Sequence, residues 1–242
     1  MLLPALTRAL APFGLNLIGV TTPAAYDALV PASHQLGGTG PARGIVVIGN
    51  GGGGFWAAYR DHCDQHDRWS EREHPLDDFT TLVMERYALP VAERLGLAPQ
   101  LRLPFQETAL SFVHLAEAAG LGRRGLLRVL LHPEFGPWLA LRGALLITEA
   151  PAAPRPAAGF DPCPSCRDRP CVSACPGGAM TPTEGWDVPR CIDFRVARAD
   201  ENPCATRCHA RVACVYGRRH VYPDDALAYH HERAFAVMRR GR

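Results

Sequence analysis

Residues 163–176 read Cys163-Pro-Ser-Cys166-Arg-Asp-Arg-Pro-Cys171-Val-Ser-Ala-Cys175-Pro176. Closely spaced thiols that end in Cys-Pro are how a loop surrounds an iron–sulfur cube. The usual bacterial run is C-x2-C-x2-C-x3-C-P, whereas the second gap here is four residues long. The stretch therefore predicts an electron-transfer protein, or a redox enzyme that carries its own electron-transfer groups.

Four more cysteines follow this run, and together the eight thiols make two complete sets of four. In two-cluster ferredoxins, the cysteine that precedes proline binds the other cluster. We therefore expect Cys175 to leave the first set and to join the downstream group. The expected sets are Cys163, Cys166, Cys171 and Cys214 for one cluster, and Cys175, Cys191, Cys204 and Cys208 for the other.

The bulk composition of the 242-residue chain narrows the class of protein. Its hydrophobic content is 47%, so the core does not need cross-links to compensate for small size. The formal net charge is only +2, and we do not expect nucleic acid as a partner. No convincing signal peptide or apolar run of ~20 residues is present. We expect a cytoplasmic protein with no membrane partner.

Other interpretations of the cysteines remain open. A single cluster with spare cysteines is compatible with the second group, which has no proline after Cys214. Structural zinc also binds four thiolates, although these usually come from separated CxxC pairs. Clustered cysteines in the cytoplasm more often bind metal or do redox chemistry than form disulfides. The ninth cysteine, Cys63, is interpreted as a bystander on a helix.

A proline- and alanine-rich stretch at residues 150–159 divides the chain into residues 1–152 and residues 160–242. The first part mixes helical and extended patterns, and the second contains the clustered cysteines. Helices are expected at 2–10, 23–29, 55–66, 77–95 with an interruption near Pro90, and 107–119; strands at 15–20, 44–49 and 101–103; and a hairpin of strands 126–131 and 138–147. Together they predict an α+β layered domain followed by a cysteine-rich module.

Two residues of the predicted helix 107–119 are candidates for proton transfer. Glu107 and His114 are seven residues apart, which is two helical turns and hence the same face. They are therefore a candidate catalytic acid–base pair in a cleft, with purely structural roles as the alternative. His132, in the predicted turn of the hairpin, is either a turn residue or a side chain that reaches a pocket.

The glycine-rich stretch Gly49–Gly54 follows a predicted strand and satisfies the pattern G-x-G-x-x-G. A dinucleotide site would also need an acidic residue ~20 positions on, at the end of a second strand. Asp67 is near that distance, but it lies in a polar helical stretch. The pattern is therefore better interpreted as a flexible turn from a strand to a helix.

Two strings outside the cysteines resemble known families. Ala119-Gly-Leu-Gly-Arg-Arg-Gly125, with the apolar run and the turn before Trp138, resembles the cobalamin-dependent epoxyqueuosine reductases, in which a double-cluster ferredoxin module follows. Ala11-Pro-Phe-Gly14 and the string HPEFGPWLALRG at 132–143 resemble the CblC-type cobalamin-processing proteins. Where the reductases carry an aspartate proton donor, this sequence has Gln106 with Glu107 adjacent.

These resemblances imply a nitroreductase-like domain at residues 1–152 and a ferredoxin-like iron–sulfur module at residues 160–242. They imply two [4Fe-4S] clusters, with one as the alternative, and cobalamin or a related corrinoid. Residues implied to shape or line the corrinoid pocket are Gly120, Gly122, Gly125, His132, Gly136 and Trp138.

The implied function is an oxidoreductase that reduces the corrinoid or uses it in a reductive reaction. Its electrons would come from a donor such as a flavodoxin or a ferredoxin reductase. One alternative is a ferredoxin-type electron carrier whose first domain is a docking scaffold. Another is a corrinoid-trafficking protein whose clusters reduce only its cargo.

Overall fold

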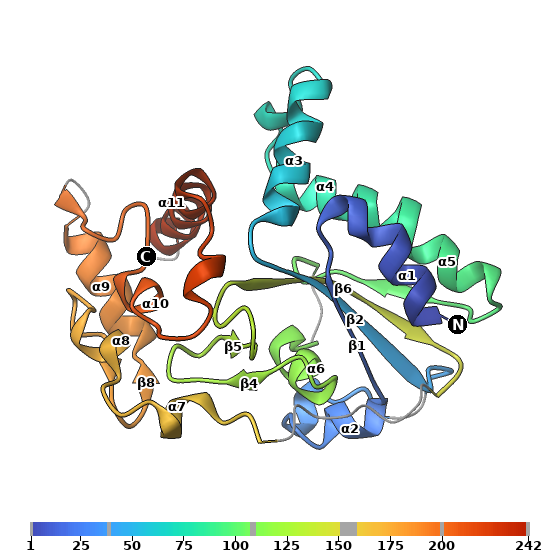
Figure 1. Cartoon of the computed structure of the whole chain (residues 1–242), viewed down its shortest axis with the longest axis horizontal. Helices are drawn as coiled ribbons and strands as arrows, with labels where there is room; N and C mark the ends of the chain where they lie inside the picture. Colours follow the sequence, from blue (N-terminus) through green and yellow to red (C-terminus); the bar gives the residue numbers. More distant parts are fainter. Residues whose placement is uncertain (1, 38–39, 107–109, 151–158, 199–200, 241–242) are drawn as a thin grey trace. The chain divides into compact units, whose positions relative to one another are not determined.

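The computed structural model describes residues 2–37, 40–106, 110–150, 159–198 and 201–240. The chain divides into two compact units (Figure 1). The first unit comprises Met1–Gly122 and Leu139–Ala158, and the second comprises Arg123–Trp138 and Gly159–Arg242. The segment Arg123–Trp138, which lies inside the predicted first domain, therefore packs with the cysteine-rich part of the chain.

A four-stranded antiparallel sheet forms the centre of the first unit, in the order β1-β2-β6-β3. Its strands are β1 (Leu17–Thr21), β2 (Gly44–Gly51), β3 (Gln100–Arg102) and β6 (Leu139–Ile147). Every residue of β2 is buried, because this central strand is covered on both faces. The register of β2 against β6 shifts between Ile48 and Gly49. A Cβ on Gly49 would lie 2.6 Å from the carbonyl oxygen of Ala140, so this bulge requires glycine.

The described residues of the first unit form the α-helices α1 (Leu2–Leu10), α2 (Pro23–Asp27), α3 (Gly54–Gln65), α4 (Pro75–Val83), α5 (Leu89–Arg94) and α6 (Phe112–Ala118). In Figure 1, α1, α4 and α5 lie on one side of the sheet, and α2 and α6 lie on the other. A π-helical turn at Met84–Ala88 joins α4 to α5. It forms the predicted interruption, because Pro90 has no N–H to donate to the preceding turn.

The mixture of helix and sheet confirms the predicted α+β class at that level, but the predicted hairpin of strands 126–131 and 138–147 is wrong. The short strand β5 (Leu130–Leu131) pairs with β4 (Arg123–Arg124), and β6 pairs with β2 and β3. His132 and Gly136 exchange backbone hydrogen bonds of 2.9 and 2.8 Å across the turn between them. The turn therefore closes on itself and does not extend into a ladder with β6.

The second unit consists of short helices and strands around the cysteines, together with the longer helices α9 (Val188–Ala197) and α11 (Asp224–Arg240). Besides β4 and β5, the short elements are α7 (Pro162–Ser165), α8 (Pro170–Ser173), β7 (Met180–Thr181), β8 (Gly185–Trp186) and α10 (His209–Val212). Its buried core is formed by Leu127, Leu131, Met180, Ala210 and Cys214, with other cysteines packed against it. Across the described parts of the chain, no helix is both long and apolar enough to cross a membrane.

Candidate metal centres

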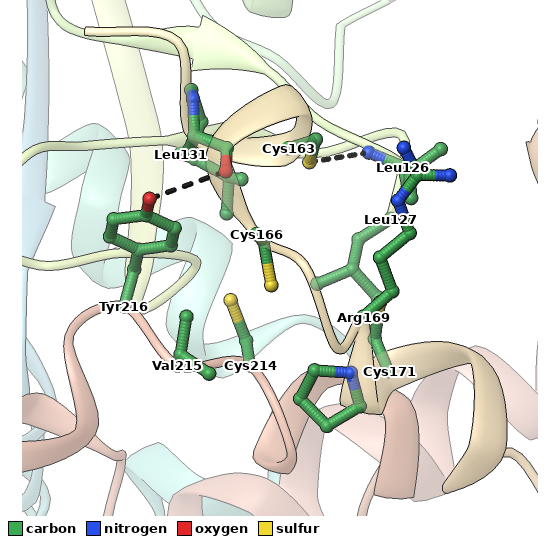
Figure 2. Close-up of a pocket in the computed structure, with 12 residues that line it drawn as sticks. Leu126, Leu127, Leu131, Cys163, Cys166, Arg169, Cys171, Cys214, Val215 and Tyr216 are labelled. Carbon is green, nitrogen blue, oxygen red and sulfur yellow. Dashed lines mark hydrogen bonds between the residues drawn. The ribbon is translucent and has the colours of Figure 1, made fainter. Parts of the chain in front are cut away.

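The first cysteine set lines one cavity of the second unit (Figure 2). Cys163 lies in α7 and Cys166 follows at its C-terminal end, Cys171 lies in α8, and Cys214 comes shortly after α10. Figure 2 shows the sulfur atoms of Cys166 and Cys214 pointing toward each other. Three short segments thus bring together the four thiols that the sequence grouped.

Cys214 is buried, the other three cysteines of this set are partly buried, and the four thiols lie close to one another. Burial raises the pKa of Cys171, and the neighbouring thiols of Cys214, Cys163 and Cys166 raise it further. Burial also raises the pKa of Cys214, although the backbone N–H of Tyr216 opposes this shift. Such thiols resist ionisation by themselves, and a cationic metal core would remove that penalty.

Gly125 allows the backbone to approach the first set. A Cβ on Gly125 would lie 2.5 Å from Cδ1 of Leu131 and 2.9 Å from Sγ of Cys163. The next residue, Leu126, donates its backbone N–H to Sγ of Cys163 at 3.3 Å, as Figure 2 shows. N–H groups aimed at cysteine sulfur are the contacts that tune an iron–sulfur group. Gly125, implied to shape a corrinoid pocket, therefore lies beside a candidate metal ligand.

The second set, Cys175, Cys191, Cys204 and Cys208, lines a separate cavity of about 190 Å³ in the same unit. Apolar side chains form much of its wall: Leu127, Val129, Met180, Trp186, Ala234 and Met238. Two arginines and two histidines also line it: Arg195, Arg211, His209 and His231. The cavity therefore combines four thiols, a mostly apolar wall and one cationic side chain that is 4% exposed.

Burial dominates the electrostatics of the second set as well. It raises the pKa of Cys204 to about 11, with smaller contributions from the other three thiols, while Arg195 opposes the shift. Burial raises the pKa of Cys208, and the backbone N–H groups of Arg211 and Ala210 lower it. Burial, followed by Arg195, lowers the pKa of His231 to about 4. Two arginines, the buried Arg195 and the half-buried Arg211, therefore place positive charge next to these thiols.

The residues present fit an iron–sulfur group at each set. Among the described residues, no three Cys, His, Asp or Glu side chains form a group that could hold a metal ion as they stand. Each set nevertheless surrounds one cavity with four thiols, the donor set that a [4Fe-4S] cluster takes from protein. In the second cavity, Nε of Arg195 is buried without a hydrogen-bond partner among the described residues. A buried cation suits the negative charge of an all-thiolate cluster.

Local backbone structure accounts for Gly120. It ends α6 with φ of 73°, and its N–H donates to the carbonyl of Glu117 at 3.0 Å. The N–H of Leu121 donates to the carbonyl of Ala116 at 2.9 Å, which completes a Schellman cap. Gly122 has φ of 155°. The expected end of the helix at Gly120 is confirmed, whereas a corrinoid role for either glycine stays a prediction.

His132 and Trp138 make contacts within the second unit. Nδ1 of His132 accepts the backbone N–H groups of Glu134 and Phe135 at 3.1 and 3.3 Å, as a turn residue does. Trp138 is fully buried and lies edge-on to Tyr222, with ring centroids 5.6 Å apart. These contacts stabilise the loop, and the implied pocket roles of both residues stay predictions.

The structure does not support the argument that placed Glu107 and His114 on one helical face. The helix α6 begins at Phe112, and Leu110 and Ser111 lie outside it. Glu107 lies outside the described residues. His114 is hydrogen-bonded through Nδ1 to Oγ of Ser111 at 2.6 Å. The seven-residue spacing therefore no longer implies that the two side chains meet.

Sequence reasoning missed Arg195. The residue lies four positions after Cys191 in α9, so the two share one face of that helix. This spacing from a candidate ligand was the available signal. Sequence reasoning also missed the backbone N–H of Leu126, for which no side-chain pattern exists.

Comparison with known proteins supports the resemblance, although no protein-family model matches the chain. Epoxyqueuosine reductase from Listeria monocytogenes is 32% identical over 125 residues, which are 51% of this chain and 32% of that protein. Epoxyqueuosine reductase from Synechococcus sp. is 39% identical over 90 residues, 36% of this chain and 26% of that protein. The matched region thus spans a third or less of the length of these curated relatives.

Solved structures show the same fold at low identity. Epoxyqueuosine reductase from Streptococcus thermophilus has a TM-score of 0.59 and 15% identity, over 90% of this chain and 66% of that one. The B12-trafficking protein CblC from C. elegans has a TM-score of 0.61 and 13% identity, over 98% and 93%. An epoxyqueuosine reductase with a tRNA stem loop has a TM-score of 0.50 and 17% identity, over 92% and 67%. The chain therefore resembles both families in fold.

Proposed function

We propose that this chain is an iron–sulfur redox protein that binds a corrinoid and either reduces it or uses it in a reductive reaction. The observation that carries the proposal is the arrangement of eight cysteines in two sets of four, each around one cavity. Similarity to epoxyqueuosine reductases and to CblC supports the corrinoid. Residues 1–152 would form the nitroreductase-like domain, and residues 160–242 would form the ferredoxin-like module.

Each cysteine set would hold one [4Fe-4S] cluster, with a single cluster as the alternative. Such clusters transfer single electrons at potentials set by net charge, hydrogen bonds to sulfur and solvent exposure. The protein would supply thiolates, the N–H of Leu126 near Cys163, and apolar walls that exclude water. Nine free cysteines suit a reducing compartment, so we propose a cytoplasmic protein with a donor such as a flavodoxin or a ferredoxin reductase.

The corrinoid part of the proposal rests on the similarity. The described contacts of Gly120, Gly125, His132 and Trp138 are to other protein groups, and they do not by themselves form a corrinoid site. Gly122 and Gly136 also remain candidates for shaping the pocket. Glu107 and His114 stay a proposed proton-transfer pair, which Glu107→Gln and His114→Asn would test by slowing corrinoid-dependent turnover without lowering iron content.

Anaerobic purification with iron and sulfide counting, followed by a cobalamin titration, tests the proposal. We expect about eight iron and about eight sulfide per chain, as two four-iron clusters require. We also expect saturable binding of cobalamin, with a change in its visible spectrum on reduction. Zinc or no metal in oxygen-free material would overturn the iron–sulfur part. Full clusters without cobalamin binding would overturn the corrinoid part alone.

A ferredoxin-type electron carrier is the second candidate function. It is favoured by the contacts of the candidate pocket residues, several of which are accounted for by capping, turn formation or core packing. In that case the first unit would dock a partner oxidoreductase. The titration separates the two functions, because a carrier keeps its clusters and ignores cobalamin. Stoichiometric single turnover would instead indicate a corrinoid-trafficking protein, as CblC is described.

Nucleic acid was not expected as a partner, and this expectation needs a direct test. An epoxyqueuosine reductase with a related fold has been solved with a tRNA stem loop. The net charge of +2 gives no strong electrostatic drive toward RNA. Titration of the cluster-loaded protein with a labelled tRNA anticodon stem loop at low and moderate salt would decide the matter.

A further inference from the structure

Arg195 is buried beside the second cysteine set. It belongs to α9, is 4% exposed, and lines the same cavity as Cys175, Cys191, Cys204 and Cys208. Arginine remains charged at all ordinary pH values, so this position holds a permanent positive charge. Its burial means that water screens the charge only weakly.

Two nitrogens of this guanidinium bind the C-terminal helix α11. Nη2 donates to the carbonyl of His231 at 3.1 Å, and Nη1 contacts Sδ of Met238 at 3.3 Å. The guanidinium carbon also lies 5.1 Å from the ring centre of Phe235. The third nitrogen, Nε, is buried and has no hydrogen-bond partner among the described residues.

The charge of Arg195 is balanced by no carboxylate that the structure describes. A buried guanidinium without a counter-ion is strongly unfavourable unless the site itself supplies negative charge. Four thiolates around an iron–sulfur core would supply that negative charge, and each electron that the cluster accepts would add one further negative charge.

The first cysteine set lacks such a group among the described residues. Arg169 lines its cavity but is partly exposed, and its Nη1 donates to the carbonyl of Pro182 at 2.6 Å. Arg218 acts on Cys214 from an exposed position. Exposed charges are screened by solvent and contribute little. A buried positive charge, that of Arg195, therefore distinguishes the second cysteine set from the first.

We propose that Arg195 raises the reduction potential of the cluster held by the second cysteine set above that of the cluster held by the first. This inference rests on the proposed function, in which both sets hold clusters. Reduction adds one electron to a site that is already anionic, and the buried guanidinium stabilises that extra charge. No bond is made or broken, and the electron comes from an external one-electron reductant. The second cluster is therefore reduced first when one electron enters the module.

The test is a redox titration of the anaerobic, cluster-loaded full chain with dithionite and mediators, followed by EPR. Arg195→Gln removes the buried charge, and Arg198→Gln removes an exposed charge from the end of the same helix as the matched control. In wild-type protein we expect two resolved steps. Arg195→Gln should lower the reduction potential of the higher step by at least about 59 mV, which is a tenfold change in the equilibrium constant for one electron. The potential of the lower step should stay unchanged. Arg198→Gln should move neither step.

Arg195→Lys keeps the inference testable if Arg195→Gln loses iron. Lysine retains the positive charge, so the equilibrium constant for reduction should fall less than tenfold. Lysine lacks the planar guanidinium that contacts α11, so that helix should lose hydrogen-exchange protection. Full iron content with unchanged potentials in Arg195→Gln, or a shift confined to the lower step, would overturn the inference. A wild-type protein without iron would instead overturn the proposed function on which it rests.

Discussion

The backbones of Gly136 and Gly217 pack directly against each other. A Cβ on Gly136 would lie 2.9 Å from the backbone nitrogen of Gly217 and 2.3 Å from the carbonyl oxygen of Tyr216. A Cβ on Gly217 would lie 2.6 Å from the nitrogen of Gly136. Both residues have positive φ values, 55° and 67°. The turn that begins at His132 therefore positions the segment that follows Cys214.

Replacing Gly136 by alanine should destabilise the second unit. The left-handed backbone conformation strains any other residue, and the added methyl group would overlap the backbone near Tyr216. We expect Gly136→Ala to lower the free energy of unfolding by more than about 2 kcal/mol. Gly159→Ala is the matched control, because Gly159 has φ of 81° but no atom within 4 Å of its Cβ position. Equal losses for the two variants in urea denaturation would contradict the role of close packing.

The turn at His132 should make stability depend on pH. Burial lowers the pKa of His132, His220 also lowers it, and Glu134 opposes the shift. The unfolded chain therefore binds a proton more readily, and protonation removes the acceptor for two backbone N–H groups. The stability that the neutral His132 contributes is fully present above pH 6.5, the pKa in the unfolded chain. It is lost as pH falls from there through the lower pKa of the folded state.

His132→Asn should keep a hydrogen-bond acceptor for the turn and remove this titration. Urea denaturation between pH 5 and 8 would show a smaller loss of stability at low pH than in wild-type protein. His34→Asn, at an exposed histidine, is the control and should leave the pH profile unchanged. A His132→Asn profile that follows wild type would show that other groups cause the acid loss.

Removing one ligand of the first set should affect one cluster. We expect Cys214→Ser to lose up to about half of the iron, because only one set of four thiols is broken. Cys63→Ser should keep all of it, since Cys63 lies in α3 of the first unit and lines neither cysteine cavity. Iron and sulfide counts on oxygen-free protein provide the measurement. Complete iron loss in both variants would indicate general instability, and full retention in Cys214→Ser would remove this residue from the ligand set.

A buried side-chain hydrogen bond links β2 to β6 in the first unit. Asn50 is 2% exposed, and its Oδ1 accepts the Nε proton of Arg142 at 2.8 Å. The guanidinium carbon of Arg142 lies 4.2 Å from the ring centre of Phe55. Asn50→Ala should lower the free energy of unfolding by about 1.5–3 kcal/mol, because this hydrogen bond to a buried charged group is lost. Gln35→Ala, which removes an exposed amide, should change it by less; similar losses in thermal denaturation would contradict the prediction.

Local patterns in the sequence predicted local structure well. The helix expected at residues 23–29 is present as α2 (Pro23–Asp27), which begins where Thr22 accepts the N–H of Ala25 and Pro23 occupies the first turn. Gly120 ends α6 for the same kind of reason. The hairpin prediction was wrong because the apolar runs on either side of His132 show burial but not strand partners. Which strands pair depends on contacts between distant segments, and a short run carries no mark of them.

The sequence alone determined the donor chemistry, because the number and spacing of the thiols can be counted along the chain. It also predicted the grouping of Cys214 with the first three cysteines, by the ligand pattern of two-cluster ferredoxins. Only the tertiary structure decided what surrounds each group. It places the buried guanidinium of Arg195 beside the second set, and it directs the backbone N–H of Leu126 at Cys163 of the first set. Charge, burial and backbone donors reach these thiols through space, so the order of residues along the chain could not specify them.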